Sequence, residues 1–435
     1  MKFIYKESSL VTDEEIKTVG EGLSSYIIKL QGIAEKNDFT EAECSMNCPF
    51  DEELIAKVKT LVREKSTVQL KYIFLIGIGG SNLGTKAIYD AVGGYFDALE
   101  PERVPKMIFV DTTNSEQLMR CGVLISTLSS REEVLIISIS KSGGTVETTA
   151  NTEIILSQYK EKFGDGFDRV VVITDEQSPL WNASVAKNMS VLPLHGLVGG
   201  RYSVFSPVGL FPLAMLGYDI DGMIERVHAM RDQCLGEDIY KNPAALSAII
   251  TFIHLTKGKT ISDTFVFHSE LESMGKWYRQ LMGESIGKEK DISDNEVNTG
   301  MTPTVSVGST DLHSMGQLYL GGPKDKLTTF IYAFDVGKDM SMPQDRIFPD
   351  LVQMIQGKTT KQIMAAILGG TKMAYQKREL PFTEIVLEDI SAASIGEYFQ
   401  FKMVEMMYLA HLMEVNAFDQ PNVEHYKTGT KTLLQ

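Results

Sequence analysis

Short apolar runs rich in β-branched residues recur along the first half of the chain and constrain its fold more than any other feature. Stretches with helical spacing of apolar residues separate them. The runs are YIFLI at Tyr72 to Ile76, KMIFVD at Lys106 to Asp111, VLIISI at Val134 to Ile139, RVVVITD at Arg169 to Asp175 and MSVLPL at Met189 to Leu194. Strands apolar on both faces and separated by helices are typical of a parallel sheet covered on both sides. The sequence therefore predicts a doubly wound α/β module.

Strand-like runs return after a more helical region that begins beyond Arg201. They are DTFVFH at Asp263 to His268, TVSV at Thr304 to Val307 and TTFIYAFDV at Thr328 to Val336. A chain of 435 residues exceeds the size at which one hydrophobic core usually keeps growing, so we expect about two domains. The predicted fold class is α/β, with two doubly wound parallel-sheet modules and additional helices. The first module spans 65–210, and the second, larger module combines 1–64 with 211–435.

Two helices are predicted from apolar spacing in the second module. Ser394 and Glu397 have the spacing of a capping box at the start of a long amphipathic helix. Its methionine-rich stripe is interpreted as core, because flexible thioethers fill irregular gaps. An earlier helical pattern ends at Gly283, which is predicted to break the helix and to leave Glu284 at its end.

Composition excludes several classes of partner. The net charge of −15 opposes broad contact with nucleic acid or with anionic lipid, while a small anion remains compatible with local positive groups. Four cysteines without CxxC spacing favour a reducing compartment, and Cys44 and Cys48 have no second ligand pair nearby for a metal. No run has the length of a signal peptide or membrane span, so we expect a cytoplasmic protein.

Two turns rich in glycine and hydroxyl groups follow the first and third predicted strands. They read GIGGSNLG from Gly77 and SKSGGT from Ser140. In open parallel sheets, ligands bind beyond the carboxyl ends of the strands, where helix N-terminal amides and hydroxyls can hold a phosphate. Each turn alone is equally compatible with simple helix capping. Together they favour a phosphate site.

Two nucleotide-binding motifs resemble these turns and fail at defining positions. The first turn has Asn82 where the dinucleotide fingerprint needs Gly or Ala, although Asp111 ends the next strand where a ribose-binding acid would lie. The second turn has Lys141-Ser142 as a Walker A loop does, but Ser140 replaces the preceding glycine. A bound nucleotide is therefore disfavoured at both turns.

Several further segments resemble the glucose-6-phosphate isomerase (phosphoglucose isomerase) family in its shorter bacterial form. The resemblance extends from about Tyr72 to Lys427. Its most specific part is Val198-Gly199-Gly200-Arg201-Tyr202-Ser203 with Ser206 and Gly209, and the same chain order holds for GIGGSNLG, SKSGGTVET, GESIGK and the motif from His313 to Gln317. Taken singly, Arg201 is interpreted as a surface charge and Glu284 as a structural carboxylate. His313 alone is interpreted as a histidine that makes ordinary hydrogen bonds.

The resemblance implies two sugar-isomerase modules, a homodimer with a shared active site, and interconversion of glucose 6-phosphate and fructose 6-phosphate without cofactor or metal. It implies that Glu284 is the base that moves a proton between C1 and C2, that Arg201 stabilises the enediolate, and that His313 of the partner subunit and Lys427 assist ring opening. The residues implied to bind substrate are Gly80, Ser81, Ser140, Lys141, Ser142, Thr145, Gly200 and Gln280. The expected partner is a small sugar phosphate, with neither nucleic acid nor membrane.

Three rival functions remain open from the sequence. A regulatory protein of the same fold could bind a sugar phosphate without catalysis, but it would not need Glu284, His313 and Arg201 together. A nucleotide-dependent dehydrogenase could use the turn at Gly77, and it would bind NAD. An amino-sugar isomerase related by fold is disfavoured by the GGRYS segment.

Overall fold

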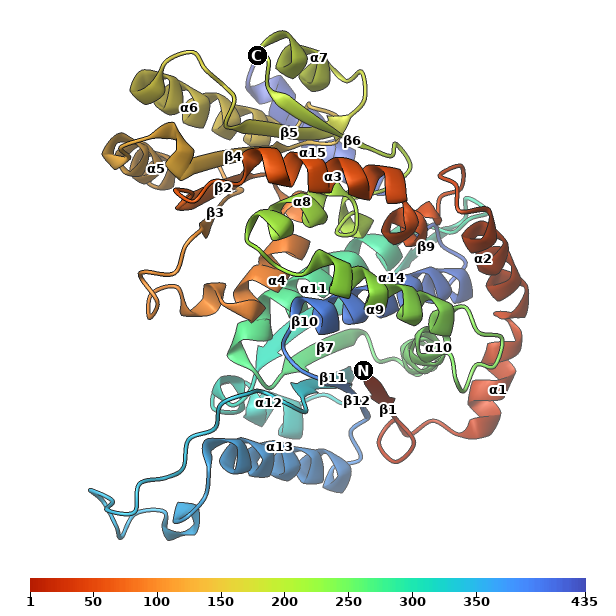
Figure 1. Cartoon of the computed structure of the whole chain (residues 1–435). Coiled ribbons are helices and arrows are strands. Elements are labelled where there is room, and N and C mark those ends of the chain that lie inside the picture. The colour runs from red at the N-terminus through yellow and green to blue at the C-terminus, as the bar shows by residue number, and fades with distance from the viewer.

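Two mostly parallel sheets organise the chain, and the computed structural model describes all 435 residues (Figure 1). The first sheet has the order β3-β2-β4-β5-β6, and all its neighbouring strands are parallel. Its strands are β2 (Tyr72–Ile76), β3 (Lys106–Val110), β4 (Val134–Ile139), β5 (Val170–Asp175) and β6 (Ser190–Leu194). The five strands predicted for the first module are confirmed, each to within a residue at either end.

The second sheet has the order β1-β12-β11-β7-β10. Its strands are β1 (Lys2–Ile4), β7 (Ile261–Val266), β10 (Thr302–Val307), β11 (Lys326–Ala333) and β12 (Phe382–Leu387), and β8 (Lys288–Lys290) pairs with β9 (Glu296–Thr299) in a separate hairpin. Only β1 runs antiparallel to its neighbour. The α/β class with two parallel sheets is confirmed. The sequence reading missed β12, because Glu384 interrupts its apolar run although that side chain is buried.

A layer of helices lies between the two sheets (Figure 1). It contains α4 (Leu83–Val92), α8 (Pro207–Met215), α9 (Ile220–Cys234), α10 (Pro243–Thr256), α11 (Glu272–Ile286) and α14 (Ala392–Leu412). The outer faces carry α5 (Ser115–Thr127) and α6 (Val146–Phe163) on the first sheet, and α12 (Gly316–Gly321) and α13 (Thr360–Lys377) on the second. The peripheral helices are α1 (Asp13–Glu21), α2 (Ser24–Lys36), α3 (Glu52–Lys65), α7 (Pro179–Ala186) and α15 (Val423–Leu433).

One hydrophobic core continues from the first sheet through the central helices to the second. It includes Leu75 and Ile137 from the first sheet and Val266 and Ile331 from the second. Smaller clusters fill the space between each sheet and its outer helices. The helices of the central layer are therefore fixed from both sides, which makes them rigid supports for a site.

The long helix α14 differs from its prediction. It begins at Ala392, with Ser391 as the N-cap, so the predicted capping box is wrong. The Glu397 carboxylate instead accepts a hydrogen bond from the amino group of Met1 at 3.0 Å. Side chains on all sides of α14 are buried, so the helix is a central core element and not amphipathic.

The sequence predicted that helix α11 would break at Gly283. The helix instead continues to Ile286. A glycine inside a helix costs only about 1 kcal/mol relative to alanine, and burial of the flanking Met282 and Ile286 offsets that cost. Glu284 therefore lies in the last turn of a packed helix.

A buried ion pair joins α14 to its neighbours. Lys402 Nζ lies 2.8 Å from Glu405 Oε1, and both side chains are almost inaccessible to solvent. The Glu405 carboxylate also accepts from Tyr278 of α11 at 2.9 Å and from Ser247 of α10. Burial lowers the pKa of Lys402, so its positive charge depends on Glu405.

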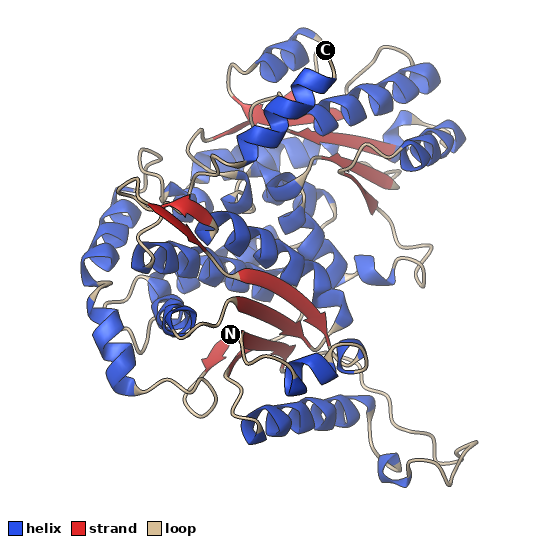
Figure 2. Ribbon diagram, turned by 180° about the vertical axis from the view of Figure 1, so that it is seen from behind, coloured by secondary structure: helices blue, strands red, loops and turns tan.

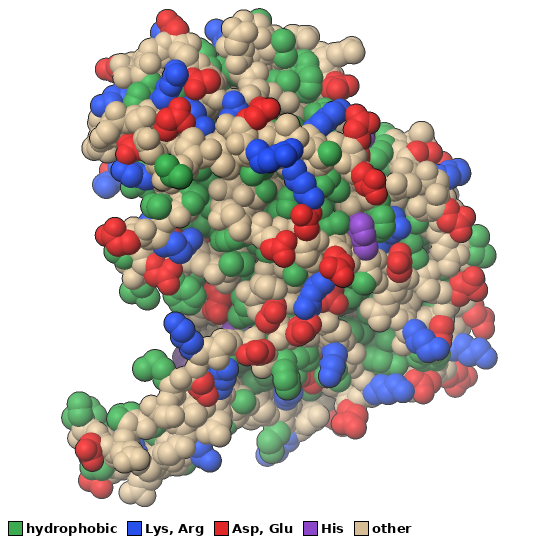
Figure 3. Space-filling view, viewed as in Figure 1, with side chains coloured by type: hydrophobic (Ala, Val, Ile, Leu, Met, Phe, Trp, Pro, Cys, Tyr) green, Lys and Arg blue, Asp and Glu red, His purple; other side chains and the backbone are tan.

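The view from behind shows the two ends of the chain on different sheets (Figure 2). The N-terminus enters beside the second sheet, and α15 carries the C-terminus toward the first sheet. No helix is both long enough and apolar enough to span a membrane. On the face in Figure 3, acidic and basic side chains are interspersed.

We expect Glu405→Gln to destabilise the protein by about 3–5 kcal/mol at pH 7, because the buried Lys402 ammonium loses its counter-charge. The unfolded lysine binds its proton more tightly than the buried one, so the loss should shrink as pH rises toward 10. Urea unfolding followed by circular dichroism measures both effects. Adding Lys402→Met should restore most of the stability, and a Glu405→Gln variant as stable as the parent at pH 7 would contradict this account.

Candidate active site

The two glycine-rich turns lie side by side at the edge of the first sheet. Strand β2 is flanked by β3 on one side and β4 on the other, so the chain reverses its winding direction between β2 and β4. Their carboxyl ends lead into the turns that begin at Gly77 and Ser140. A Cβ added at Gly77 would lie 3.2 Å from the carbonyl oxygen of Ile139. Ligands of open α/β sheets bind at such a reversal point.

Both turns open helices that have no side-chain cap. Asn82 precedes α4 and Thr145 precedes α6, and neither side chain bonds a first-turn amide. Ser140 Oγ lies 3.4 Å from Thr145 Oγ1. Gly143 adopts a φ of +68°, and its missing side chain leaves room for Leu180. Helix amides and hydroxyl groups thus converge where an anion could bind.

Lys141 links the second turn to the next part of the site. Its Nζ donates to the carbonyl oxygen of Gly196 at 2.5 Å. Gly196 leads into the 3-10 turn Gly200–Tyr202, which carries Arg201. Lys141 therefore connects the second glycine-rich turn to the segment that carries Arg201.

Gly80 and Gly200 bring two segments together at backbone distance. A Cβ added at Gly80 would lie 2.0 Å from the carbonyl carbon of Gly200 and 2.5 Å from the amide nitrogen of Arg201. No side chain larger than hydrogen fits there without moving one of the segments. The contact fixes Arg201 against the turn that follows β2.

Arg201 is buried, and protein groups use all five of its N–H donors. Nε donates to Ser285 Oγ at 2.9 Å, and Nη1 donates to Glu284 Oε2 at 3.2 Å and to Gln420 Oε1 at 2.8 Å. Nη2 donates to the carbonyl oxygens of Ala417 and Asp419. A guanidinium has five such donors, so this buried cation is fully satisfied.

Glu284 is held from two directions yet stays partly open. Gln280 Nε2 donates to its Oε1 at 3.1 Å, one helical turn away, while Arg201 holds Oε2. The Glu284 side chain is 36% exposed, whereas that of Arg201 is 2% exposed. Gln280 Oε1 is buried without a partner, so an acceptor remains for a hydroxyl group.

A strap formed by residues 417–420 closes the far side of Arg201. Lys288, which is buried, donates to the backbone carbonyl of Asp419 and pairs with its carboxylate at 2.9 Å. Ser285, Lys288 and Gln420 were not predicted from the sequence to be site residues. Ser285 and Lys288 adjoin Glu284 in GESIGK and could have been found by their spacing; Gln420 lies too far along the chain for any local signal.

His313 lies away from Glu284 within one chain. Helix α11 runs antiparallel to β10, because Gly275 faces Val305 and Gly283 faces Pro303. Glu284 is thus near the start of β10, and His313 follows the end of that strand with an exposed side chain. The six residues of β10 span roughly 16 Å between the first and the last Cα atom, at about 3.3 Å per step, and Glu284 and His313 lie near opposite ends of this strand.

Lys427 does not contact the other predicted residues. It lies on α15 and pairs with Glu424 on the same helix at 2.7 Å. No residue of α15 is buried. The structure therefore brings together Gly80, Gly200, Arg201, Gln280 and Glu284, with the turns at Ser81 and Ser140 to Thr145 beside them, but neither His313 nor Lys427.

No three His, Cys, Asp or Glu side chains are placed to hold a metal ion together. All four cysteines are free and buried. Burial raises the pKa of Cys44 to about 11 and that of Cys48 well above its usual value, so both are protonated thiols at neutral pH.

The chain is similar to known proteins over nearly its whole length. The Phosphoglucose isomerase family profile matches residues 51–435. A glucose-6-phosphate isomerase from Carboxydothermus hydrogenoformans is 30% identical over 99% of this chain and 92% of its own length. Another from Methanocaldococcus jannaschii is 32% identical over 85% of this chain and 86% of its own.

Solved structures agree on the fold. A hypothetical protein from Thermus thermophilus superposes with a TM-score of 0.86 at 26% identity, covering 100% of this chain and 99% of that one. A glucose-6-phosphate isomerase from Chlamydia trachomatis superposes with a TM-score of 0.82 at 20% identity, covering 98% of this chain and 86% of that one.

We expect Gly80→Ala to lower the free energy of unfolding by about 1–3 kcal/mol or more, because the new methyl group collides with the Gly200 backbone. Gly196→Ala is the matched control in the neighbouring segment, where an added Cβ meets nothing within 4 Å. Thermal unfolding of both variants checks the difference. Equal stability of the two variants would show that the segments do not approach as closely as described.

Proposed function

The chain belongs to the phosphoglucose isomerase family, and from that premise we propose how its residues interconvert glucose 6-phosphate and fructose 6-phosphate. The observation that carries the proposal is the arrangement of Glu284 between Gln280 and Arg201, beside two uncapped helix N-termini. A carboxylate that is partly open and fixed in direction is suited to take a proton from carbon.

The phosphate group of the sugar binds at the paired turns. Ser81, Ser140, Ser142 and Thr145 supply hydroxyl groups, the start of α6 supplies amides, and Lys141 supplies one positive charge. Substrate-binding contacts here serve to position the sugar, so that its C1 and C2 atoms lie over Glu284. Gly80 and Gly200 keep the phosphate end and the carboxylate end of the site at a fixed separation.

Glu284 moves the proton between the two carbons. It removes the C2 proton of the open-chain aldose, and the electron pair forms the C1–C2 double bond while O1 gains negative charge. The proton on O2 passes to O1, and Glu284 returns a proton to C1, which yields the ketose. Negative charge develops on O1 and O2 during this transfer, so the group that faces these oxygens must be a cation or a hydrogen-bond donor.

Arg201 supplies that donor in the proposed mechanism. Its Nη1 is shared between Glu284 and the side chain of Gln420, and Gln420 is the exposed partner. Substrate oxygen replaces the Gln420 amide on Nη1, so that the guanidinium stays satisfied throughout. Gln280 Oε1 accepts from a sugar hydroxyl.

We further propose that two subunits share each active site. His313 assists ring opening at the site of the partner subunit, which accounts for its exposed position far from Glu284 of its own chain. Lys427 on the exposed helix α15 acts in the same step. Both roles are implied by the resemblance to the family.

The arm between β11 and α13 is an observation that favours a dimer. Residues 335–359 project from the molecule, and the view in Figure 3 shows hydrophobic side chains at its tip. Its exposed apolar residues are Met340, Ile347, Phe348, Leu351, Val352 and Met354. Such a patch on an extended arm is typical of a protein–protein contact, and a second copy of the chain is the occupant that we propose.

Glu284→Gln should lower kcat by at least about 10³-fold and leave KM nearly unchanged. The new amide oxygen can still accept from Arg201, and its NH2 can donate to Gln280 Oε1 once the Gln280 amide turns over, but the amide cannot take a proton from carbon. Glu237→Gln, an exposed carboxylate without partners, is the control and should retain full activity. A coupled assay of glucose 6-phosphate formation measures both variants. Activity within tenfold of the parent would remove Glu284 from the proton transfer.

Co-expression of a Glu284→Gln chain with a differently tagged His313→Ala chain tests the shared site. In the mixed dimer, one site combines the intact Glu284 of one chain with the intact His313 of the other, so we expect about half of the parental activity per purified heterodimer. Each variant alone should be nearly inactive. A heterodimer as inactive as the two variants would place both residues in the same chain's site and contradict the proposal.

A further inference from the structure

An acidic pocket is lined in part by the strap, and Arg201 is not among its lining residues. It has a volume of about 520 Å³ and is formed by α2, residues 41–43, the loop at 291–294, the end of α14 and the strap. Six carboxylates line it, namely Glu41, Glu43, Asp291, Asp294, Glu414 and Asp419. The volume is in the range of small-molecule sites.

One of these carboxylates is incompletely satisfied. Glu43 is only 3% exposed, and its Oε1 accepts from Tyr26 at 3.0 Å and from Lys29 at 2.6 Å. Its Oε2 is buried without any partner. A buried carboxylate oxygen without a donor is costly, and a ligand that supplies a donor would relieve that cost.

The lysines of the chain neutralise only part of the negative charge in the pocket. Lys29 pairs with Glu43, Lys288 with Asp419 at 2.9 Å, and Lys290 with Asp294 at 2.7 Å. Glu41 and Glu414 have no cationic partner, and neither does Asp291, whose carboxylate accepts only from Ser293 and Asn295. Burial lowers the pKa of His411, so its ring adds no charge at neutral pH.

The wall around Glu43 suits an ammonium group. Tyr26 stacks on His411 with ring centroids 4.3 Å apart, and Lys29 Nζ lies 5.6 Å from the centre of the Tyr26 ring. The lysine ammonium thus already occupies a position between a carboxylate and an aromatic face. Its side chain is 48% exposed, so it can leave this position when another cation enters.

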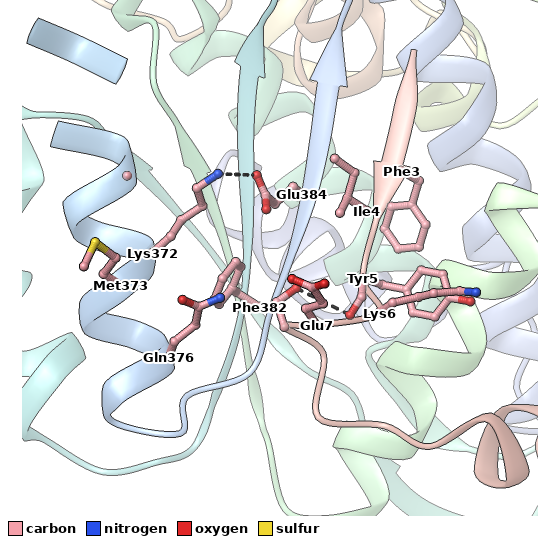
Figure 4. Close-up of a pocket in the computed structure, with 12 residues that line it drawn as sticks. Phe3, Ile4, Tyr5, Lys6, Glu7, Lys372, Met373, Gln376, Phe382 and Glu384 are labelled. Atoms are coloured by element: carbon pink, nitrogen blue, oxygen red, sulfur yellow. Dashed lines mark hydrogen bonds and ion pairs between the residues drawn. The ribbon is translucent and has the colours of Figure 1, made fainter. Parts of the chain in front are cut away.

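A second cavity differs in this respect. It has a volume of about 650 Å³ and lies between β1 and α13, and Glu284 is not among its lining residues (Figure 4). Its buried carboxylate, Glu384, accepts from Lys372 at 2.9 Å and from Tyr332 at 2.8 Å. With that charge neutralised, this cavity gives no comparable indication of a ligand.

We propose that the acidic pocket binds a small organic cation with two or more ammonium groups, one of which replaces Lys29 at Glu43 and donates to Oε2 as well as to Oε1 of that carboxylate. The carboxylates are too dispersed for three of them to hold a single metal ion. An extended cation can reach Glu43 at one end and Glu414 elsewhere on the wall, while its methylene groups pack on the apolar part of the lining. Nothing in this proposal depends on the catalytic roles assigned above.

Isothermal titration of the full chain with spermidine or 1,4-diaminobutane, at about 20 mM salt, tests the proposal. We expect saturable binding to one site per chain that weakens as salt is raised, because the attraction is electrostatic. Lys29→Met should tighten binding by about fivefold relative to Lys36→Met, since it removes the internal competitor in addition to one positive charge. Lys36 is exposed on the same helix and has no ion-pair partner.

Glu43→Gln and the exposed-site variant Glu414→Gln should each weaken binding by about fivefold relative to Glu161→Gln, a matched loss of charge on α6. Glu414→Gln keeps the test valid if Glu43→Gln folds poorly. Absence of saturable binding, equal affinity of Lys29→Met and Lys36→Met, or complete displacement by one equivalent of MgCl₂ would each overturn the proposal.

Discussion

The approach of two glycine backbones, Gly80 and Gly200, is the constraint on which the site depends. It joins the turn after β2 to the segment that carries Arg201 at a distance that excludes any side chain. Arg201 then connects the first sheet to α11, through Ser285 and Glu284, and to the strap near the C-terminus. The glycine contact and the buried cation together therefore fix the relative position of four segments that are distant in sequence.

The hydrophobic core holds the elements of the site in these positions. Helix α11 packs between α4 and α14, and the ion pair of Lys402 and Glu405 adds a polar link to Tyr278. Because α11 is held from both sides, Glu284 can face the site at the end of a rigid element while remaining partly exposed. Placing reactive groups on supported helices is how an enzyme keeps its geometry during turnover.

Sequence patterns predicted most of the parallel strands, since strands buried on both faces read as continuous apolar runs. They missed β12, where Glu384 is buried in a strand and neutralised by Lys372, a partner that no local pattern reveals. The turns and Arg201 were found because their chemistry is local in sequence. Gln420 and Lys288 were missed because their roles arise from tertiary contacts, and the separation of Glu284 from His313 follows only from the antiparallel course of α11 and β10.

Proton transfer between C1 and C2 at Glu284 is the central step of the proposed mechanism. Nuclear magnetic resonance of glucose 6-phosphate with the purified chain in heavy water tests it most directly. We expect fructose 6-phosphate to form, with deuterium entering C2 of the aldose and C1 of the ketose as the carboxylate exchanges its proton with solvent. Conversion with no deuterium at either carbon, even after many turnovers, would contradict this step, as would the absence of conversion by folded protein that binds the sugar phosphate.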